Sequence, residues 1–165
     1  MTLPNIEQIC QQLAHDLADY LQQQNIHNPL LVGIRTGGVW VAERLQSQLQ
    51  LSDDATGVLD ISFYRDDFTQ HGLHPQVKGS ELPESIEDRH IILVDDVIMS
   101  GRTIRAAMHE LFDFGRPASI TLVCLLDIGR RELPIQPDVC GTRLDLADGQ
   151  LVKLGGPNPL TLTIA

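Results

Sequence analysis

The sequence predicts an α/β fold: a mainly parallel, twisted sheet with helices on both faces. Aliphatic runs of strand length alternate with stretches of helical periodicity, which is typical of right-handed crossovers onto a parallel sheet. No internal repeat or low-complexity linker divides the chain. The length of 165 residues, with 42% hydrophobic and 21% charged residues, suits a single domain covering residues 1–165.

Each element has its own local signal. Asn5 and Gln8 resemble a capping box, and apolar residues then recur at helical spacing, which predicts an N-terminal helix. Gly115, followed soon by Pro117, predicts the end of a later helix. Strands are expected over residues 30–34, 58–64, 91–96 and 119–126, and further helices over residues 39–49 and 103–114.

Two segments look irregular. Residues 65–85 are polar, rich in Gly, Pro and His, and too long for a plain connection, so we expect a mobile loop that covers a site. His71 and His74 lie in this loop, where they lack a fixed scaffold, so no metal site made by the protein alone is expected. Residues 127–165 are dense in Pro and Gly and are expected to form a small hood over the carboxyl edge of the sheet.

Composition narrows the class of partner. A formal net charge of −10 argues against broad, nonspecific binding to nucleic acid, because that affinity comes from a basic surface. No apolar run approaches the roughly 20 residues of a membrane helix, so a cytoplasmic protein with no membrane partner is expected. Cys10, Cys124 and Cys140 form no CxxC pair and are interpreted as reduced thiols.

The strongest chemical signal lies in residues 91–103. An aliphatic strand there ends in Asp95 and Asp96, and open α/β sheets bind their ligands at the carboxyl ends of strands. Ionised carboxylates accept short, strong hydrogen bonds from the vicinal hydroxyls of a ribose. The turn that follows offers hydroxyls and amides at a helix N-terminus, which suits a phosphate. The motif predicts a sugar-phosphate site, and the simpler alternative is an ordinary loop start or helix cap.

A second turn of the same kind, residues 33–38, lies between another expected strand and its helix. Its glycines permit close approach of the backbone to a ligand, and its amides point outward at the start of the helix. This arrangement suits pyrophosphate. A Gly-rich strand-to-helix turn without any ligand is the alternative.

Residues 94–103 resemble the phosphoribosyl pyrophosphate (PRPP) loop of the type I phosphoribosyltransferases, in which an aliphatic run, two acids and three residues precede Thr-Gly. Residues 102–108, 114–120 and 131–135 are similar to one branch of this family, the bifunctional pyrimidine operon regulatory proteins with uracil phosphoribosyltransferase activity. The resemblance covers essentially the whole chain. It implies a type I phosphoribosyltransferase fold and the conversion of uracil and PRPP to UMP and pyrophosphate.

The resemblance also implies roles for individual residues, with the acid pair as the catalytic residues. The ribose 5-phosphate of PRPP would be bound by Asp95, Asp96, Val97, Ile98, Met99, Ser100, Gly101, Arg102 and Thr103. Pyrophosphate would be bound by Arg35, Thr36, Gly37, Gly38 and Arg65. The base would be bound by Val139 and Cys140. Mg²⁺, shared between PRPP and the acid pair, is the implied cofactor. Gly37 departs from the family pattern, because the best-known relatives have Arg at its position.

Other functions remain open at this point. In the branch that the chain resembles, a dimer presents a basic face to messenger RNA, so a homo-oligomer is expected and Arg130, Arg131 and Arg143 are candidates for RNA binding. An RNA-binding transcriptional attenuator with little catalysis is one alternative, which salt-dependent affinity for a specific RNA would identify. A purine phosphoribosyltransferase is another, because composition does not distinguish uracil from hypoxanthine or guanine.

Overall fold

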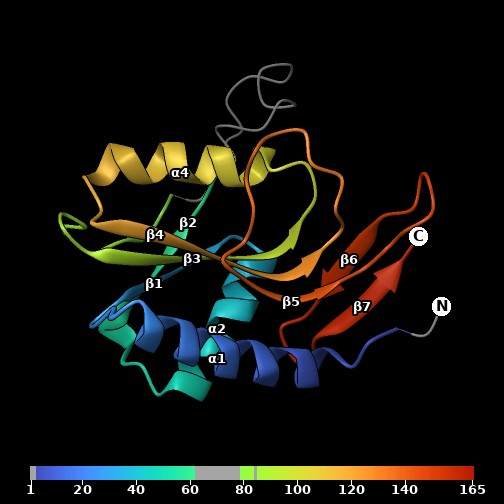
Figure 1. The fold of residues 1–165 in the computed structure, drawn as a ribbon, viewed down its shortest axis with the longest axis horizontal. Helices are drawn as coiled ribbons and strands as arrows, with labels where there is room; N and C mark the ends of the chain where they lie inside the picture. Colours follow the sequence, from blue (N-terminus) through green and yellow to red (C-terminus); the bar gives the residue numbers. More distant parts are fainter. Residues whose placement is uncertain (1–2, 62–78, 84) are drawn as a thin grey trace.

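The computed structural model describes residues 3–61, 79–83 and 85–165. Its centre is a five-stranded parallel sheet in the order β2–β1–β3–β4–β5 (Figure 1). The strands are β1 (Leu30–Ile34), β2 (Thr56–Leu59), β3 (His90–Ile98), β4 (Ser119–Asp127) and β5 (Val139–Arg143). The helices are α1 (Ile6–Gln23), α2 (Gly37–Leu49) and α4 (Arg102–Phe114), with a short 3-10 helix, η1 (Asp53–Ala55). The predicted α/β class with a mainly parallel sheet is confirmed.

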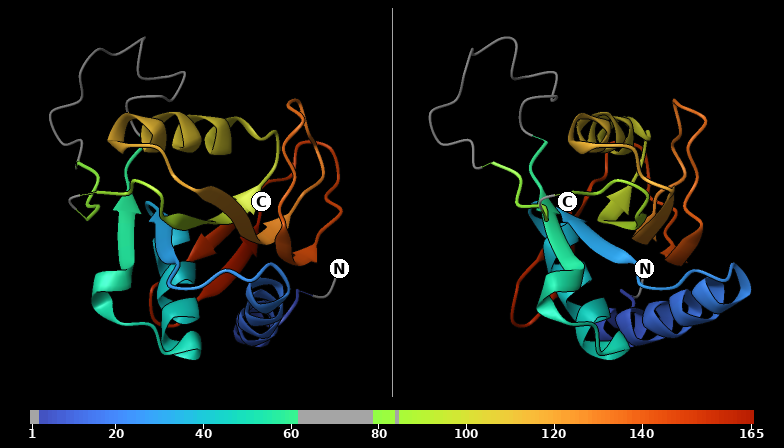
Figure 2. Two further views of the ribbon diagram at one scale, coloured as in Figure 1. Left: turned by 60° about the vertical axis from the view of Figure 1, so that its left-hand side comes forward. Right: turned by 90° about the vertical axis from the view of Figure 1, so that its left-hand side faces the viewer.

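Helices cover both faces of the sheet, as predicted. α1 and α2 lie on one face and α4 lies on the other, so the sheet is the middle of three layers (Figures 1 and 2). The apolar side chains divide in the same way, because one core cluster joins α1 and α2 to the sheet and a second joins α4 to it. Every residue of β1 is buried, which explains why this strand is a nearly continuous aliphatic run without polar alternation.

The helix ends follow their sequence signals. Asn5 caps α1, because its Oδ1 atom accepts a hydrogen bond from the backbone N–H of Gln8 (3.2 Å). α4 ends at Phe114, as predicted, and Gly115 follows with a φ of +149°. A Cβ atom at Gly115 would lie 2.9 Å from Glu87 Oε1, so both conformation and space favour glycine there. None of the helices in the described part of the chain is long and apolar enough to span a bilayer.

The boundaries nearest the predicted site differ from expectation. β3 does not end at the acid pair but continues to Ile98, because β4 pairs with it as far as Asp127. α2 begins at Gly37 and α4 begins at Arg102, two residues and one residue earlier than predicted. The acid pair therefore lies within the strand, and the turns that follow β1 and β3 are shorter than the sequence suggests.

β2 also departs from its prediction. It begins two residues earlier than expected and ends at Leu59. The last part of the predicted strand, residues 62–64, lies outside the described residues, as does most of the loop predicted over residues 65–85. Glu81, from the described part of that loop, forms an antiparallel bridge with Val58 of β2.

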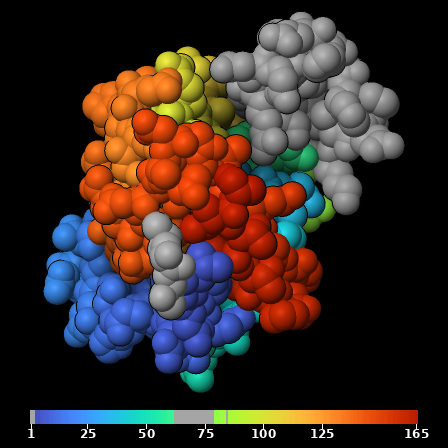
Figure 3. Space-filling model, turned by 90° about the vertical axis from the view of Figure 1, so that its right-hand side faces the viewer, coloured from blue at the N-terminus to red at the C-terminus, as the bar shows by residue number. Residues whose placement is uncertain are grey.

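Only part of the C-terminal region, residues 127–165, lies in a hood as predicted. β5 is the edge strand of the main sheet, parallel to β4, so this part of residues 127–165 belongs to the sheet, and the name hood is used below for residues 144–165. It contains an antiparallel hairpin of β6 (Val152–Gly155) and β7 (Thr161–Ile164). Arg44 of α2 fixes the hairpin, because its Nη2 atom donates to the carbonyl oxygen of Pro157 (2.7 Å). In Figure 3 the hood faces the viewer, next to the start of α1.

Candidate active site

The acid pair lies in the carboxyl-terminal part of β3, in the middle of the sheet. Asp95 is only 5% exposed, and its Oδ1 atom accepts a hydrogen bond from the backbone N–H of Asp96 (2.9 Å). Asp96 is half-buried, and its Oδ1 atom accepts a hydrogen bond from the N–H of Val97 (2.8 Å). The two carboxylates thus differ in exposure, and Asp96 is the more accessible of the two to a ligand.

The β3–α4 turn, taken here together with the first two residues of α4 (residues 99–103), carries the predicted phosphate-binding groups. Gly101 has a φ of +94°, a conformation that favours glycine. α4 begins at the next residue, and Ser100 Oγ accepts a hydrogen bond from the N–H of Arg102 (3.1 Å). Thr103 is exposed in the first turn of the helix. Amides and two hydroxyls therefore gather at the positive end of a helix, where a phosphate is stabilised.

The β1–α2 turn, residues 35–38, lies directly against the acid pair. A Cβ atom at Gly38 would lie 3.1 Å from Cα of Asp95, and a Cβ atom at Gly37 would lie 3.0 Å from Cβ of Asp96. Glycine is the residue that allows backbone to approach this closely. The structure therefore brings together, at one edge of the sheet, the two turns that the sequence identifies as separate ligand-binding motifs.

Arg35 follows the carboxyl end of β1. Its backbone N–H donates to the carbonyl oxygen of Leu59 (2.9 Å), which fixes the backbone beside β2. Its Nη2 atom donates to the carbonyl oxygen of Gly79 (3.5 Å), and its Nε atom lies 3.9 Å from Asp60 Oδ2. Nε is buried and has no hydrogen-bond partner among the described residues, so the ion pair with Asp60 is its compensating interaction there. Arg65, the other cation predicted here, lies outside the described residues.

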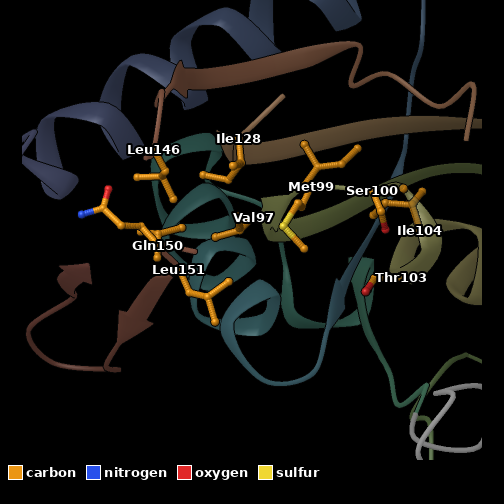
Figure 4. A pocket seen from close by; sticks show the side chains of 12 residues that line it. Val97, Met99, Ser100, Thr103, Ile104, Ile128, Leu146, Gln150 and Leu151 are labelled. Atoms are coloured by element: carbon orange, nitrogen blue, oxygen red, sulfur yellow. The ribbon is translucent and has the colours of Figure 1, made fainter. Parts of the chain in front are cut away.

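A cavity of about 200 Å³ opens beside the β3–α4 turn (Figure 4). Residues of β3, the turn and α4 form one side of it, and residues of the hood form the other. Its walls are mostly apolar, and the side chains that define them in Figure 4 include Val97, Met99, Ile128, Leu146, Gln150 and Leu151. A cavity with apolar walls and a few polar groups suits a small flat ring.

The predicted base contacts, Val139 and Cys140, lie elsewhere. They begin β5, and their register partners are Val123 and Cys124 in the middle of β4, away from the carboxyl edge. Val139 is 7% exposed and belongs to the core cluster that contains α1. Both residues line a separate, open hollow against α1. They therefore lie apart from the cavity beside the β3–α4 turn, whose other side is formed by residues of the hood.

Sequence motifs do not predict the hood side of the cavity, because Gln150 and Leu151 belong to no chemical motif. The local signal is Asp148-Gly149, a dipeptide typical of tight turns, two residues before β6. Gly149 does have a positive φ, +82°. Such a signal predicts a turn, but it does not reveal that the turn faces β3.

The arginines predicted to contact RNA differ in their surroundings. Arg143 exposes 66% of its side chain and lies 3.5 Å from Asp145, an exposed pair that contributes little to stability. Arg130 and Arg131 are half-buried and donate hydrogen bonds to acceptors within the protein. Of the three, Arg143 has the guanidinium most accessible to a partner.

The cysteines are unsuited to nucleophilic catalysis. Burial raises the pKa of Cys10 to about 11, with Glu7 adding to the shift and Arg44 opposing it. Burial likewise raises the pKa of Cys124 and of Cys140. All three are free thiols. A thiol with a raised pKa stays protonated near neutral pH and is a poor nucleophile.

Comparison with known proteins identifies the family. Residues 2–150 match the model of the phosphoribosyl transferase domain. The chain belongs to this family. This phosphoribosyltransferase is 59% identical over 164 residues to the bifunctional protein PyrR of Pseudomonas fluorescens, covering 99% of this chain and 97% of that protein. It is 58% identical over 162 residues to the bifunctional protein PyrR of Pseudomonas aeruginosa, covering 98% of this chain and 95% of that protein.

Solved phosphoribosyltransferases share the fold. The hypoxanthine phosphoribosyltransferase of Trypanosoma cruzi superposes with a TM-score of 0.64 at 22% identity, covering 89% of this chain and 79% of that chain. A hypoxanthine phosphoribosyltransferase from Staphylococcus aureus gives a TM-score of 0.62 at 20% identity, covering 84% of this chain and 75% of that chain. At these identities the likeness shows the fold alone. The predicted fold, enzyme class and family branch of this phosphoribosyltransferase are thus confirmed.

Proposed function

We propose that this phosphoribosyltransferase transfers the phosphoribosyl group of PRPP to uracil, giving UMP and pyrophosphate, and that it also regulates pyrimidine gene expression. One observation carries the enzymatic part: Asp96 and the two strand-to-helix turns meet at one edge of the sheet, beside a cavity. The PyrR relatives, at 59% identity and described as bifunctional, support the combination of two roles.

PRPP offers three polar parts, and the site offers a partner for each. The 5′-phosphate accepts hydrogen bonds from amides and hydroxyls of residues 100–103 at the N-terminus of α4. The ribose hydroxyls donate to Asp96, the more accessible carboxylate of the pair. The pyrophosphate lies against the N-terminus of α2, on the side of Arg35, whose guanidinium carries a positive charge at the end of β1.

The reaction breaks the bond from C1 of the ribose to pyrophosphate and forms a bond from C1 to N1 of uracil, with loss of the N1 proton. Positive charge develops on the ribose while negative charge accumulates on the leaving pyrophosphate. Asp96 binds the sugar, and the buried Asp95 lends negative potential where solvent screening is weak. Catalysis then comes from positioning and electrostatics.

Mg²⁺ fits this site as a cofactor shared with the substrate. Among the described residues no group of three or more His, Cys, Asp or Glu side chains could hold a metal ion. Mg²⁺ requires no such group, because it binds one or two carboxylates together with substrate phosphates and water. Asp96 supplies an accessible carboxylate. When bound, the ion neutralises charge on the leaving pyrophosphate.

Uracil is proposed to occupy the cavity between Val97 and Leu151. The apolar walls suit the two faces of a flat ring. Gln150 and the main-chain groups of the hood supply donors and acceptors for the edge of the ring. The base would then lie at the same end of β3 as the ribose, because Asp96 and Val97 are both in the carboxyl-terminal part of this strand.

Regulation is proposed to act through a homodimer that binds RNA in the cytoplasm, where the three free cysteines remain reduced. A formal net charge of −10 confines the RNA contact to a local patch. Arg143 is our candidate for that patch, because its side chain is 66% exposed. Affinity for a pyrimidine-operon RNA that falls steeply with salt would support this role, and undetectable affinity at low salt would contradict it.

Turnover of PRPP with uracil, hypoxanthine and guanine, measured in parallel with Mg²⁺ present, tests the enzymatic proposal. We expect kcat/KM for uracil to exceed that for either purine by about 100-fold or more, because unmatched polar groups in a buried site are strongly disfavoured. Preferential turnover of a purine would overturn the choice of base. Turnover of no base at all would favour the attenuator instead.

A further inference from the structure

Two arginines that are adjacent in the chain, Arg130 and Arg131, follow β4 on the segment that leads to β5. The proposed phosphoribosyl transfer involves neither arginine, and the sequence alone suggests both as RNA contacts. Their guanidinium groups, however, bind two different parts of the protein. One part is the β3–α4 turn, and the other is the hood.

All five N–H donors of the Arg131 guanidinium are in use. Nη1 donates to the carbonyl oxygen of Met99 (3.0 Å) and to Asp127 Oδ1 (2.9 Å). Nη2 donates to Asp127 Oδ2 (2.7 Å) and to Gln136 Oε1 (3.1 Å), and Nε donates to the carbonyl oxygen of Ile135 (2.7 Å). The side chains of Arg131 and Asp127 are each 14% exposed. A guanidinium bonded in this way has no donor left for RNA.

The same segment holds a second carbonyl of the β3–α4 turn. The N–H groups of Glu132 and Leu133 donate to the carbonyl oxygen of Ser100 (3.0 and 3.1 Å). In a trans peptide the C=O and N–H groups point in opposite directions, and the peptides after Met99 and Ser100 are trans. Holding these two carbonyls therefore directs the N–H groups of Ser100 and Gly101 away from the segment. These are amides that we assign to the 5′-phosphate.

Arg130 binds the hood instead. Its Nη2 atom donates to the carbonyl oxygens of Leu146 (3.1 Å) and Ala147 (2.8 Å), and its Nη1 atom donates to that of Gln150 (3.3 Å). Leu146 and Gln150 line the cavity. The turn is also closed internally, because the N–H of Gln150 donates to the carbonyl oxygen of Ala147 (3.0 Å). Arg130 thus fixes the wall of the cavity opposite β3.

We propose that these neighbours are positioning residues for two halves of one substrate site: Arg131 for the turn that binds the 5′-phosphate, and Arg130 for the wall that contacts the base. Neither arginine touches the substrate. Because both walls are held from adjacent residues, this short segment sets the spacing between the bound phosphate and the bound base. The inference rests on the proposed function, since it assigns phosphate and base to those two walls.

Arg131→Lys and Arg130→Lys, compared in the full-length protein, test the inference, and each variant is the control for the other. Lysine keeps the charge but cannot reproduce the fork of donors. Arg131→Lys is expected to raise the KM for PRPP about tenfold and the KM for uracil by a smaller factor, because the turn also forms one side of the cavity. Arg130→Lys is expected to raise the KM for uracil about tenfold and the KM for PRPP by a smaller factor. Arg116→Lys, at an exposed site just beyond α4, should change neither value.

Thermal unfolding of each variant separates positioning from loss of the fold. If Arg131→Lys is too unstable to assay, Asp127→Asn removes the paired carboxylate charge and must raise the KM for PRPP selectively. Equal changes of both KM values in either lysine variant, or no change in both, would overturn the inference. A preference of the wild-type enzyme for a purine would instead overturn the proposed function, and the KM comparison would then be made with that purine.

Discussion

A Cβ atom at Gly37 would lie 2.6 Å from Cγ of Asp96, so a side chain at position 37 and the carboxylate in its present place exclude each other. The β1–α2 turn and β3 meet at this contact. The glycine that departs from the family pattern therefore has a physical role in this chain, because it leaves room for Asp96 beside the helix N-terminus.

Gly37→Ala is expected to displace the Asp96 carboxylate and to lower kcat/KM for PRPP between about tenfold and 100-fold, as small misplacements at reacting centres do. Steady-state kinetics at saturating uracil measures the effect. Gly79→Ala is the matched control, because a Cβ atom there meets nothing within 4 Å. Wild-type kinetics in Gly37→Ala would show that activity does not depend on the position of the Asp96 carboxylate.

Asp96→Asn should lower kcat/KM for PRPP on the order of 100-fold while leaving the fold intact, since preorganised electrostatic contacts carry effects of that size. The asparagine oxygen still accepts the hydrogen bond that Val97 N–H donates at 2.8 Å. Asp95→Asn should also lower turnover, through the lost negative potential. Circular dichroism and thermal unfolding report on the fold. Full activity in the double variant would refute both roles, ribose binding by Asp96 and charge stabilisation by Asp95.

Leu151→Ser is expected to raise the KM for uracil about tenfold and to leave the KM for PRPP unchanged, because it removes an apolar contact from the proposed base wall. Leu151 is 61% exposed, and its backbone bonds to Ala165 (2.8 and 2.9 Å) do not depend on the side chain. Stability should therefore change little. Leu3→Ser, at another exposed leucine (43%), is the control. An equal rise of both KM values would place the base elsewhere.

Glu110→Gln is expected to make folding stability less dependent on pH. Burial raises the pKa of Glu110 above its ordinary value of 4.5, Ser80 opposes this, and Asp60 and Asp113 add to it. The folded protein thus holds the proton more tightly than the unfolded chain, so wild-type stability falls as pH rises from about 4.5 through the folded pKa. Glutamine stays neutral and still accepts the Ser80 hydroxyl, which donates at 2.8 Å.

Urea unfolding at pH 4 and pH 7 checks this prediction. The variant should have a higher free energy of unfolding than the wild type at pH 7, and this difference should be smaller at pH 4. A difference that is the same at both pH values would show that the Glu110 carboxyl titrates normally in the folded protein.

Local signals in the sequence predict the helices and most of the sheet, because periodicity and capping act over a few residues. The Asn5 cap of α1 and the end of α4 at Phe114 are examples. The acid pair and both turns are likewise found from the sequence, since their chemistry requires particular residues next to one another. β3 runs on past the acids because β4 pairs with it, a contact between residues far apart in the chain.

The sequence does not predict the proposed base wall or the contacts of the two arginines, because these also depend on residues far apart in the chain. Val139 and Cys140 are apolar residues in a strand, and their position at the amino end of β5 depends on its register with β4. Leu151 reaches the cavity because the hood folds back toward β3. Arg130 and Arg131 look like free cations in the sequence, and only the folded chain supplies the carbonyl acceptors that engage them.

A crystal structure of the full-length protein with bound UMP tests the central claim most directly. We expect the 5′-phosphate on the amides and hydroxyls of residues 100–103, a ribose hydroxyl on Asp96, and the uracil ring between Val97 and Leu151. A phosphate bound away from the N-terminus of α4, or a base bound at Val139, would contradict the account.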